Sequence, residues 1–237
     1  MILKGAYVIC NIVNKMKILA IDTSSKVCSV AILENDKVID ELNLNDGKTH
    51  SENLMCLIDE ILNKNNLNVK QIEMLACSVG PGSFTGIRIG VATIKPIAEV
   101  LNIKIASVTS LETLARNIES NKTIVSLIDA RNNQVYAGIF DDKYNQKEDY
   151  IADDINIVLE KLKKYDNIVC VGDGAILHKD LIKEKISNVE FVSNNIQAAQ
   201  NVGKIGYKKY LENNLMTADE IIPIYLRKSQ AERLKKW

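Results

Sequence analysis

The chain has 237 residues, 46% of them hydrophobic and 25% charged, which is the composition of a folded globular protein and excludes a disordered one. Thirty basic residues balance thirty acidic ones, so no general electrostatic attraction draws the chain onto nucleic acid or an anionic membrane. Any RNA contact therefore has to be local or supplied by a partner. The five cysteines form no C-x-x-C pair and lie in apolar runs, which predicts reduced core residues of a cytoplasmic protein.

Residues 1–15 form a short segment ahead of a second methionine, Met16. Their apolar run AYVICNIV is too short to span a membrane, and it lacks a small-residue cleavage site. We expect this segment to be a dispensable leader or extension, or a mis-assigned start. The alternative is an extra edge strand.

Three short β-rich runs with polar corners between them follow, and they predict an antiparallel start to the fold: KILAID, VCSVAIL and VIDELNL. The next segment, HSENLMCLIDEILNK, has apolar residues at helical spacing, and Thr49 and Glu52 fit a capping box at its start. After it we expect the strand MLACSVG, a glycine-rich stretch, a helix over about residues 87–101, the strand KIASVT and a short helix over LETLARNI.

The pattern then begins again. We expect strands at TIVSLIDA, at VYAGIF and near KEDYIA, a helix, the strand NIVCVG, a GDGA turn, a helix, the strand VEFV and a helix over about residues 196–212. Residues 21–33 align with residues 128–140 without a gap, which makes Asp22 and Asp129 equivalent. We therefore predict a duplicated α/β fold whose halves, residues 16–120 and 121–237, each have a mixed β-sheet flanked by helices.

In each half an acidic residue ends the first strand, just before a polar corner. The actin, sugar-kinase and chaperone-ATPase superfamily grips a nucleotide between its halves with two such corners. Hydroxyl and backbone N–H groups receive phosphate oxygens well, so the candidate nucleotide contacts are Asp22, Thr23, Ser24, Asp129 and, in the GDGA turn, Gly172 and Asp173. All six also fit ordinary hairpin and strand-to-helix turns, and both interpretations stay open.

The glycine-rich stretch SVGPGSFTGIRIG, residues 78–90, has neither the Gly-Lys-Ser/Thr of a P-loop nor the glycine spacing of a dinucleotide fingerprint. Its glycines predict a tight turn that opens a helix, with Ser83 or Thr85 as the cap. That helix is apolar over most of its circumference, whereas a surface helix has a single apolar stripe. It is therefore either buried within its own domain or covered by a partner.

The segment GPGSFTGIRIG and the opening MKILAIDTSS together resemble the TsaB family of bacterial tRNA threonylcarbamoyladenosine biosynthesis proteins, formerly grouped with the M22 glycoproteases. The resemblance runs from Met16 to the C-terminus and includes DARNNQVYAGIF, VGDGA and IIPIYLRKSQAE. It implies a duplicated actin-like fold. It also implies a non-catalytic scaffold that activates TsaD, the transferase that places a threonylcarbamoyl group on the adenosine beside the anticodon of tRNAs reading codons that start with A.

The implied partners are TsaD, the ATPase TsaE and a second copy of the chain, and the resemblance places tRNA only within the assembled complex. No cofactor is required by this chain, although a nucleotide at the interface of the complex stays open. The basic tail RKSQAERLKKW either approaches tRNA phosphates there or, as we prefer, forms a solvated terminal helix.

The histidines give an independent reason to expect no catalytic or metal-binding residue. The catalytic relative TsaD holds a metal with two histidines at i and i+4, whereas the two histidines here, His50 and His178, lie far apart. No nucleophile elbow accompanies a serine or cysteine, which also argues against a glycoprotease. The remaining alternative is an independent actin-fold phosphotransferase that uses Asp22 and Asp129.

The resemblance favours a partner on the helix after the glycines, because the family pairs with itself and with TsaD through helices of the first half. The predicted interface consists of Arg88, Ile89, Val91, Ala92, Ile94, Lys95 and, from the preceding helix, Met55. Pro96 departs from the family, in which a small residue is common at this position, and it predicts a kink in the helix.

Overall fold

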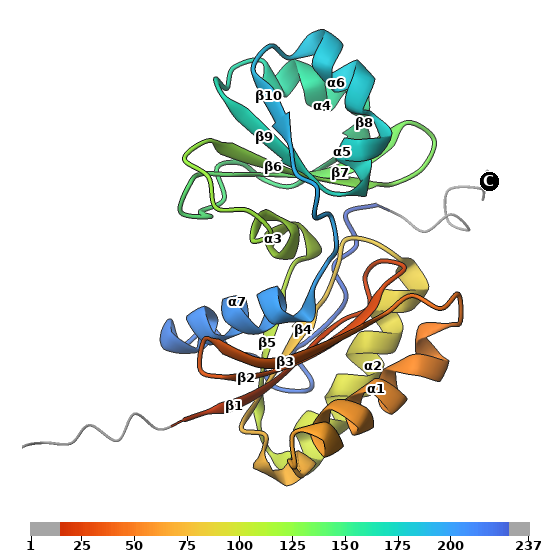
Figure 1. The fold of residues 1–237 in the computed structure, drawn as a ribbon, viewed down its shortest axis with the longest axis vertical. Helices are drawn as coiled ribbons and strands as arrows, with labels where there is room; N and C mark the ends of the chain where they lie inside the picture. Colours follow the sequence, from red (N-terminus) through yellow and green to blue (C-terminus); the bar gives the residue numbers. More distant parts are fainter. Residues whose placement is uncertain (1–14, 228–237) are drawn as a thin grey trace, which may run out of the picture.

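The computed structural model describes residues 15–227, as two sheets with helices packed around them (Figure 1). The predictions for the leader and for the basic tail concern residues that lie almost wholly outside this range. Among the helices that are described, none is both long enough and apolar enough to cross a membrane.

The first series of elements follows the predicted order. It consists of β1 (Lys17–Asp22), β2 (Cys28–Glu34), β3 (Lys37–Leu44), α1 (His50–Lys64), η1 (Val69–Gln71), β4 (Met74–Ser78), α2 (Phe84–Leu101), β5 (Lys104–Val108) and α3 (Ser110–Ala115). Helix α2 begins three residues before the expected position because the Ser83 side chain caps it, accepting a hydrogen bond from the Gly86 N–H at 3.2 Å. The helix continues through Pro96 to Leu101.

The second series also follows the predicted order. It consists of β6 (Thr123–Asp129), β7 (Gln134–Phe140), β8 (Ile151–Asp154), α4 (Ile155–Leu162), β9 (Ile168–Val171), α5 (Asp173–Leu177), α6 (Lys179–Lys185), β10 (Val189–Phe191) and α7 (Ala199–Leu211). The GDGA segment is the first turn of α5 rather than a free loop.

The two sheets have the same topology, which confirms the duplication. The first has the order β3-β2-β1-β4-β5 and the second has β8-β7-β6-β9-β10. In each, the first three strands are antiparallel and the last two are parallel additions. The corners differ by one residue, because Asp22 pairs with Ser29 whereas Asp129 pairs with Val135. The gapless alignment is therefore wrong by one residue after the corner.

Most helices pack on the sheet of their own half, but one helix of each half packs on the sheet of the other half. Helices α1 and α2 cover one face of the first sheet, and α4, α5 and α6 cover one face of the second. Helix α3 packs on the second sheet and α7 on the first, so both lie between the sheets (Figure 1). The division at residue 120 stays a prediction, but the last helix of the chain belongs structurally to the first sheet.

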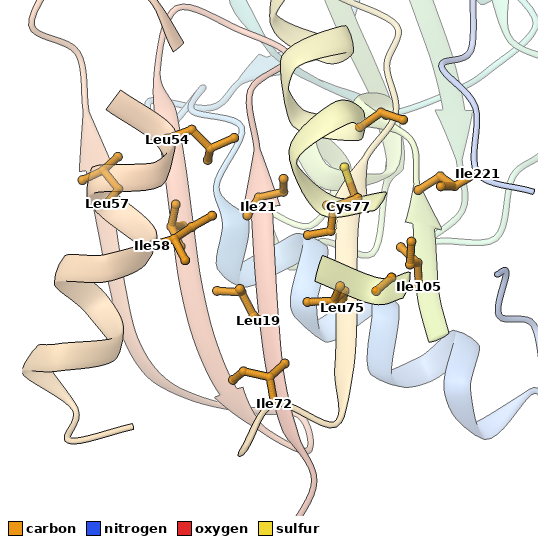
Figure 2. Packing of buried hydrophobic residues seen from close by; sticks show 14 of the residues in the cluster. Leu19, Ile21, Leu54, Leu57, Ile58, Ile72, Leu75, Cys77, Ile105 and Ile221 are labelled. Atoms are coloured by element: carbon orange, nitrogen blue, oxygen red, sulfur yellow. The ribbon is translucent and has the colours of Figure 1, made fainter. Parts of the chain in front are cut away.

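The core beneath α1 and α2 combines residues from distant parts of the chain. Figure 2 shows Leu54 and Ile58 of α1 directed at Leu19 and Ile21 of β1, with Ile221 at the other side of the same cluster. On the opposite face α7 approaches closely because it carries Gly203 and Gly206. A Cβ atom on these glycines would lie 2.2 Å from Leu33 Cδ1 and 2.8 Å from Ala76 Cβ respectively.

Candidate functional site

The first corner, which follows β1, is buried. The exposed fractions of Asp22, Thr23 and Ser24 are 0%, 1% and 2%. One carboxylate oxygen of Asp22, Oδ1, accepts hydrogen bonds from the Ser24 N–H at 2.8 Å and the Ser24 hydroxyl at 2.7 Å. The Thr23 hydroxyl donates to the carbonyl of Gly86 at 2.8 Å. All three residues therefore face the protein interior, and their contact with a nucleotide stays a prediction.

The glycine-rich stretch is what covers this corner. A Cβ atom on Gly82 would lie 2.2 Å from the Ser24 carbonyl oxygen, and one on Gly86 would lie 2.1 Å from the Thr23 carbonyl oxygen. A Cβ atom on Gly90 would lie 2.4 Å from Thr23 Oγ1. These three glycines thus let the corner lie directly against the start of α2. Sequence reasoning interpreted them as a turn and missed this contact.

Two further hydrogen bonds hold the corner in place. The Ser83 N–H donates to the Ser24 carbonyl at 2.7 Å, and His50 Nε2 lies 2.8 Å from the Ser25 carbonyl oxygen. Since His50 begins α1 and Ser83 caps α2, the corner is connected to the starts of both helices.

Asp22 is a fully buried carboxylate with only one of its two oxygens hydrogen-bonded within residues 15–227. Its second oxygen, Oδ2, is buried without a hydrogen-bond partner among residues 15–227. Desolvation raises the pKa of Asp22 to about 6, although the hydrogen bonds from Ser24 oppose the shift. The group therefore titrates close to physiological pH inside the first core.

The cysteines are mostly inert by the same reasoning. Burial raises the pKa of the Cys28 thiol to about 11 and that of Cys170 to about 12, and it also raises the pKa of Cys77. Thiols with raised pKa values are poor nucleophiles. Cys56 is the exception to the predicted burial, since it lies exposed on α1, and Cys10 is outside the described residues.

The second corner, which follows β6, is exposed and has a different conformation. Arg131, Asn132 and Asn133 all have positive φ angles, of 62°, 54° and 59°. Asn tolerates this region better than most residues, but three consecutive cases form a strained turn. Asp129 is half-buried; its Oδ1 accepts a hydrogen bond from the Arg131 N–H at 2.8 Å, and it lines an open hollow of about 460 Å³.

Gly172 and Asp173, at the start of α5, lie against the end of β6, where the second corner begins. Asp173 Oδ1 accepts hydrogen bonds from the Asp129 N–H at 3.0 Å and the Gly174 N–H at 2.8 Å. Desolvation raises the pKa of Asp173. Gly172 has a φ of 111°, and a Cβ atom there would lie 2.1 Å from the Leu127 carbonyl oxygen. Both residues thus have a structural role that explains their identities without a nucleotide.

Residues 221–227 run between the two halves. The Ile224 N–H donates to the Val79 carbonyl at 2.8 Å, beside the glycine-rich stretch. Further on, Tyr225 Oη accepts a hydrogen bond from Arg88 Nε at 2.7 Å, and Arg227 donates to the Ala130 carbonyl at 3.3 Å. The chain's own segment therefore connects the start of α2 to the second corner. Apart from the segment IIPIYLRKSQAE, which resembles the family, no pattern in the sequence predicts this path.

The predicted interface divides into core and surface residues. Val91 and Ile94 are 5% and 0% exposed and belong to the first core, so their burial does not favour the partner contact that the sequence predicts for them. They fill the sheet-facing stripe of α2. The other predicted residues reach the surface: Arg88 and Ala92 are exposed, Ile89 and Lys95 are half-buried, and Met55 is 52% exposed.

Helix α2 therefore has two apolar stripes. The second, which we call the outer stripe, consists of Ile89, Ala92, Pro96 and Val100 and follows helical spacing. Val100 is 83% exposed, the highest value among the large hydrophobic residues that are exposed in the described chain. Helix α1, with exposed Met55 and Cys56, packs beside α2 (Figure 1). The outer stripe shares Ile89 and Ala92 with the predicted interface, and Pro96 and Val100 extend it towards the end of the helix.

No group of three or more His, Cys, Asp or Glu side chains within residues 15–227 is arranged to hold a metal ion. His50 and His178 lie in different halves, and His50 is engaged with the first corner.

Two mixed sheets of the same topology, with helices exchanged between them, define the class of actin-like ATPase folds. The structure of YeaZ from Pseudomonas aeruginosa is similar, with a TM-score of 0.78 and 20% identity over 89% of this chain and all of that one. Component A of the (R)-2-hydroxyglutaryl-CoA dehydratase of Acidaminococcus fermentans shares the fold at a TM-score of 0.51 and 11% identity, over 83% of this chain and 99% of that one. At these identities the likeness concerns the fold alone.

Sequence comparison identifies the family. A curated relative from Bacillus subtilis, the tRNA threonylcarbamoyladenosine biosynthesis protein TsaB, is 35% identical over 230 residues, covering 94% of this chain and 98% of the relative. The family model described as TsaD, tRNA N6-adenosine threonylcarbamoyltransferase, matches residues 45–235. The chain belongs to the TsaB family, within the wider group that shares this domain with TsaD.

Proposed function

We propose that the chain takes part in the biosynthesis of threonylcarbamoyladenosine in tRNA as a non-catalytic scaffold that activates the transferase TsaD. The name of its Bacillus subtilis relative supports the process. The partners in this proposal are TsaD, the ATPase TsaE and a second copy of the chain, with tRNA bound only by the assembly in the cytoplasm. The chain requires no cofactor of its own.

The observation that carries the scaffold role is the outer stripe of α2. Ala92, Pro96 and Val100 are exposed, although their side chains are apolar. Contiguous apolar surface of this kind marks protein–protein contact sites. Arg88 at the helix start, stacked 3.9 Å above the Phe84 ring, supplies the kind of rim residue that interfaces favour. The stripe and the exposed side of α1 thus form one docking face.

The corners support the same conclusion from the opposite direction. The alternative enzyme would use Asp22 and Asp129 together across a cleft. Asp22 is fully buried beneath the glycine-rich stretch, and residues 221–227 lie between the start of α2 and the second corner. An actin-like fold with its first corner covered is better suited to hold a partner than to hold a nucleotide between its halves.

The docking face can be tested with a matched pair of variants. Val100→Glu places a charge in the outer stripe, and Leu211→Glu places one at the end of α7, where the leucine is also highly exposed at 62%. Binding to the cognate TsaD, measured by calorimetry, should weaken at least about tenfold for Val100→Glu, because an unpaired charge resists burial. Leu211→Glu should bind normally. Equal binding by both variants would place the interface elsewhere.

Reconstitution tests the activating role itself. Threonylcarbamoylation of tRNA by the cognate TsaD and TsaE should depend on this chain, and Val100→Glu should reduce it. A full rate without the chain would refute the proposal. The competing phosphotransferase would instead show micromolar binding of ATP with magnesium and turnover by this chain alone.

A further inference from the structure

A small hollow lies where the two halves meet on the α7 side of the molecule. Its volume is about 80 Å³. Its apolar lining consists of Phe140 at the end of β7 and Ile205 of α7, both almost fully buried. Charged residues of α3, its C-cap and α7 form the wall. Since a single buried water needs about 10–15 Å³, the hollow has room for a small organic molecule.

Most of the charges around the hollow are already engaged. Glu112 Oε2 accepts hydrogen bonds from the Thr109 N–H at 2.8 Å and the Thr109 hydroxyl at 2.9 Å. Lys209 donates to the Ser107 carbonyl at 2.7 Å and lies 3.5 Å from Glu112 Oε1. These contacts neutralise Glu112 and Lys209 against each other within the protein.

Arg116, at the C-cap of α3, differs from its neighbours. Its guanidinium lies over the ring of Tyr144 at 4.1 Å, and Tyr144 is itself fixed by donating its hydroxyl to the Ile118 carbonyl at 3.0 Å. Among residues 15–227, Arg116 has no carboxylate within salt-bridge distance. The hollow is thus lined by a cation that an aromatic ring orients and that donates no side-chain hydrogen bond to residues 15–227.

The rim adds a second cation. Lys208 is about half exposed and lies 3.8 Å from Glu212, which is a loose contact at the surface. Arg116 and Lys208 therefore both line the hollow that Phe140 and Ile205 also line, and together they outnumber the single loosely paired carboxylate, Glu212. The chemistry that matches this arrangement is an anionic head on a short apolar body.

We propose that the hollow is a binding site for a small organic carboxylate. The planar guanidinium of Arg116 receives the carboxylate through paired hydrogen bonds, Lys208 adds a second charge, and the short aliphatic part rests on Phe140 and Ile205. The wall comes from α3 and α7 and the apolar lining partly from β7, so an occupant joins the two halves. Binding therefore holds α7, which packs on the first sheet, against the end of the second sheet.

Butyrate is a suitable probe, with inorganic phosphate as a comparison for a charge without an apolar body. Chemical-shift titration of the labelled full chain should give a saturable dissociation constant on the order of 1 mM for butyrate and weaker binding of phosphate. Arg116→Gln should weaken butyrate at least about tenfold. Lys208→Gln, on the exposed rim, should weaken it less and serves if Arg116→Gln fails to fold.

Two controls keep the test specific. Arg131→Gln removes an exposed arginine at the second corner and should leave butyrate binding unchanged, and so should Val100→Glu, which separates this site from the docking face. No saturation by butyrate, or equal affinity in the Arg116, Lys208 and Arg131 variants, would overturn the proposal. Phosphate binding as tightly as butyrate would overturn the carboxylate assignment and leave a general anion site.

Discussion

The buried carboxyl of Asp22 should make the stability of the fold depend on pH in an unusual direction. Most carboxylates stabilise a folded protein as pH rises, because folding lowers their pKa. Here desolvation raises the pKa of Asp22 from 3.8 to about 6. The folded state therefore binds more protons than the unfolded state between these values, and the contribution of Asp22 to stability falls as pH rises through this window.

The size of the effect follows from the shift. A difference of about 2 pKa units corresponds to about 3 kcal/mol over the whole titration, of which about 2 kcal/mol falls between pH 4 and pH 7.5. Asp22→Asn removes the titration and keeps an oxygen that can accept the hydrogen bonds from Ser24. Its amide nitrogen replaces the oxygen that has no partner within residues 15–227, at a cost that does not vary with pH.

The assay is urea unfolding of the natural chain and of Asp22→Asn at both pH values. The free energy of unfolding of the variant, relative to the natural chain, should rise by about 2 kcal/mol from pH 4 to pH 7.5. Carboxylates elsewhere titrate equally in both proteins and cancel. A relative stability that stays constant with pH would refute the reasoning, because it would mean that Asp22 is solvated or paired in solution.

Three further changes test other contacts. In denaturant titration, Gly86→Ala should destabilise the fold by about 3 kcal/mol or prevent folding, since its Cβ would meet the Thr23 carbonyl at 2.1 Å. The control Gly47→Ala, in open space with a positive φ, should cost about 1 kcal/mol. Tyr225→Phe should cost about 1 kcal/mol in thermal unfolding through the lost bond to Arg88, and no change would mean that solvent replaces it. Ile94→Asp should abolish the folded circular-dichroism spectrum because the site is fully buried; a folded variant that merely lost partner binding would restore Ile94 to the interface.

The sequence predicts the elements and their duplication well, because each depends on local patterns. Alternating apolar runs predict the strands, and Thr49 and Glu52 predict the start of α1, where the Thr49 N–H donates to Glu52 Oε2 at 3.0 Å. The repeat at Asp22 and Asp129 predicts two sheets of one topology.

What the sequence leaves open depends on contacts between distant segments. The glycines at 82, 86 and 90 meet Thr23 and Ser24 some sixty residues earlier, and nothing in their spacing names that partner. The apolar residues of α2 likewise do not reveal which stripe faces the sheet. The sequence therefore predicts Val91, Ala92 and Ile94 as interface residues alike, although only Ala92 of the three is exposed.

Because α7 packs on the first sheet, the order of synthesis affects when that sheet can complete its folding. The chain leaves the ribosome N-terminus first, and domains usually fold as units as they emerge. Here the face of the first sheet that carries Ile18, Ala31 and Ala76 is covered by α7, whose residues are among the last to be synthesised. One apolar face of the first sheet therefore stays uncovered until the whole second sheet has been synthesised.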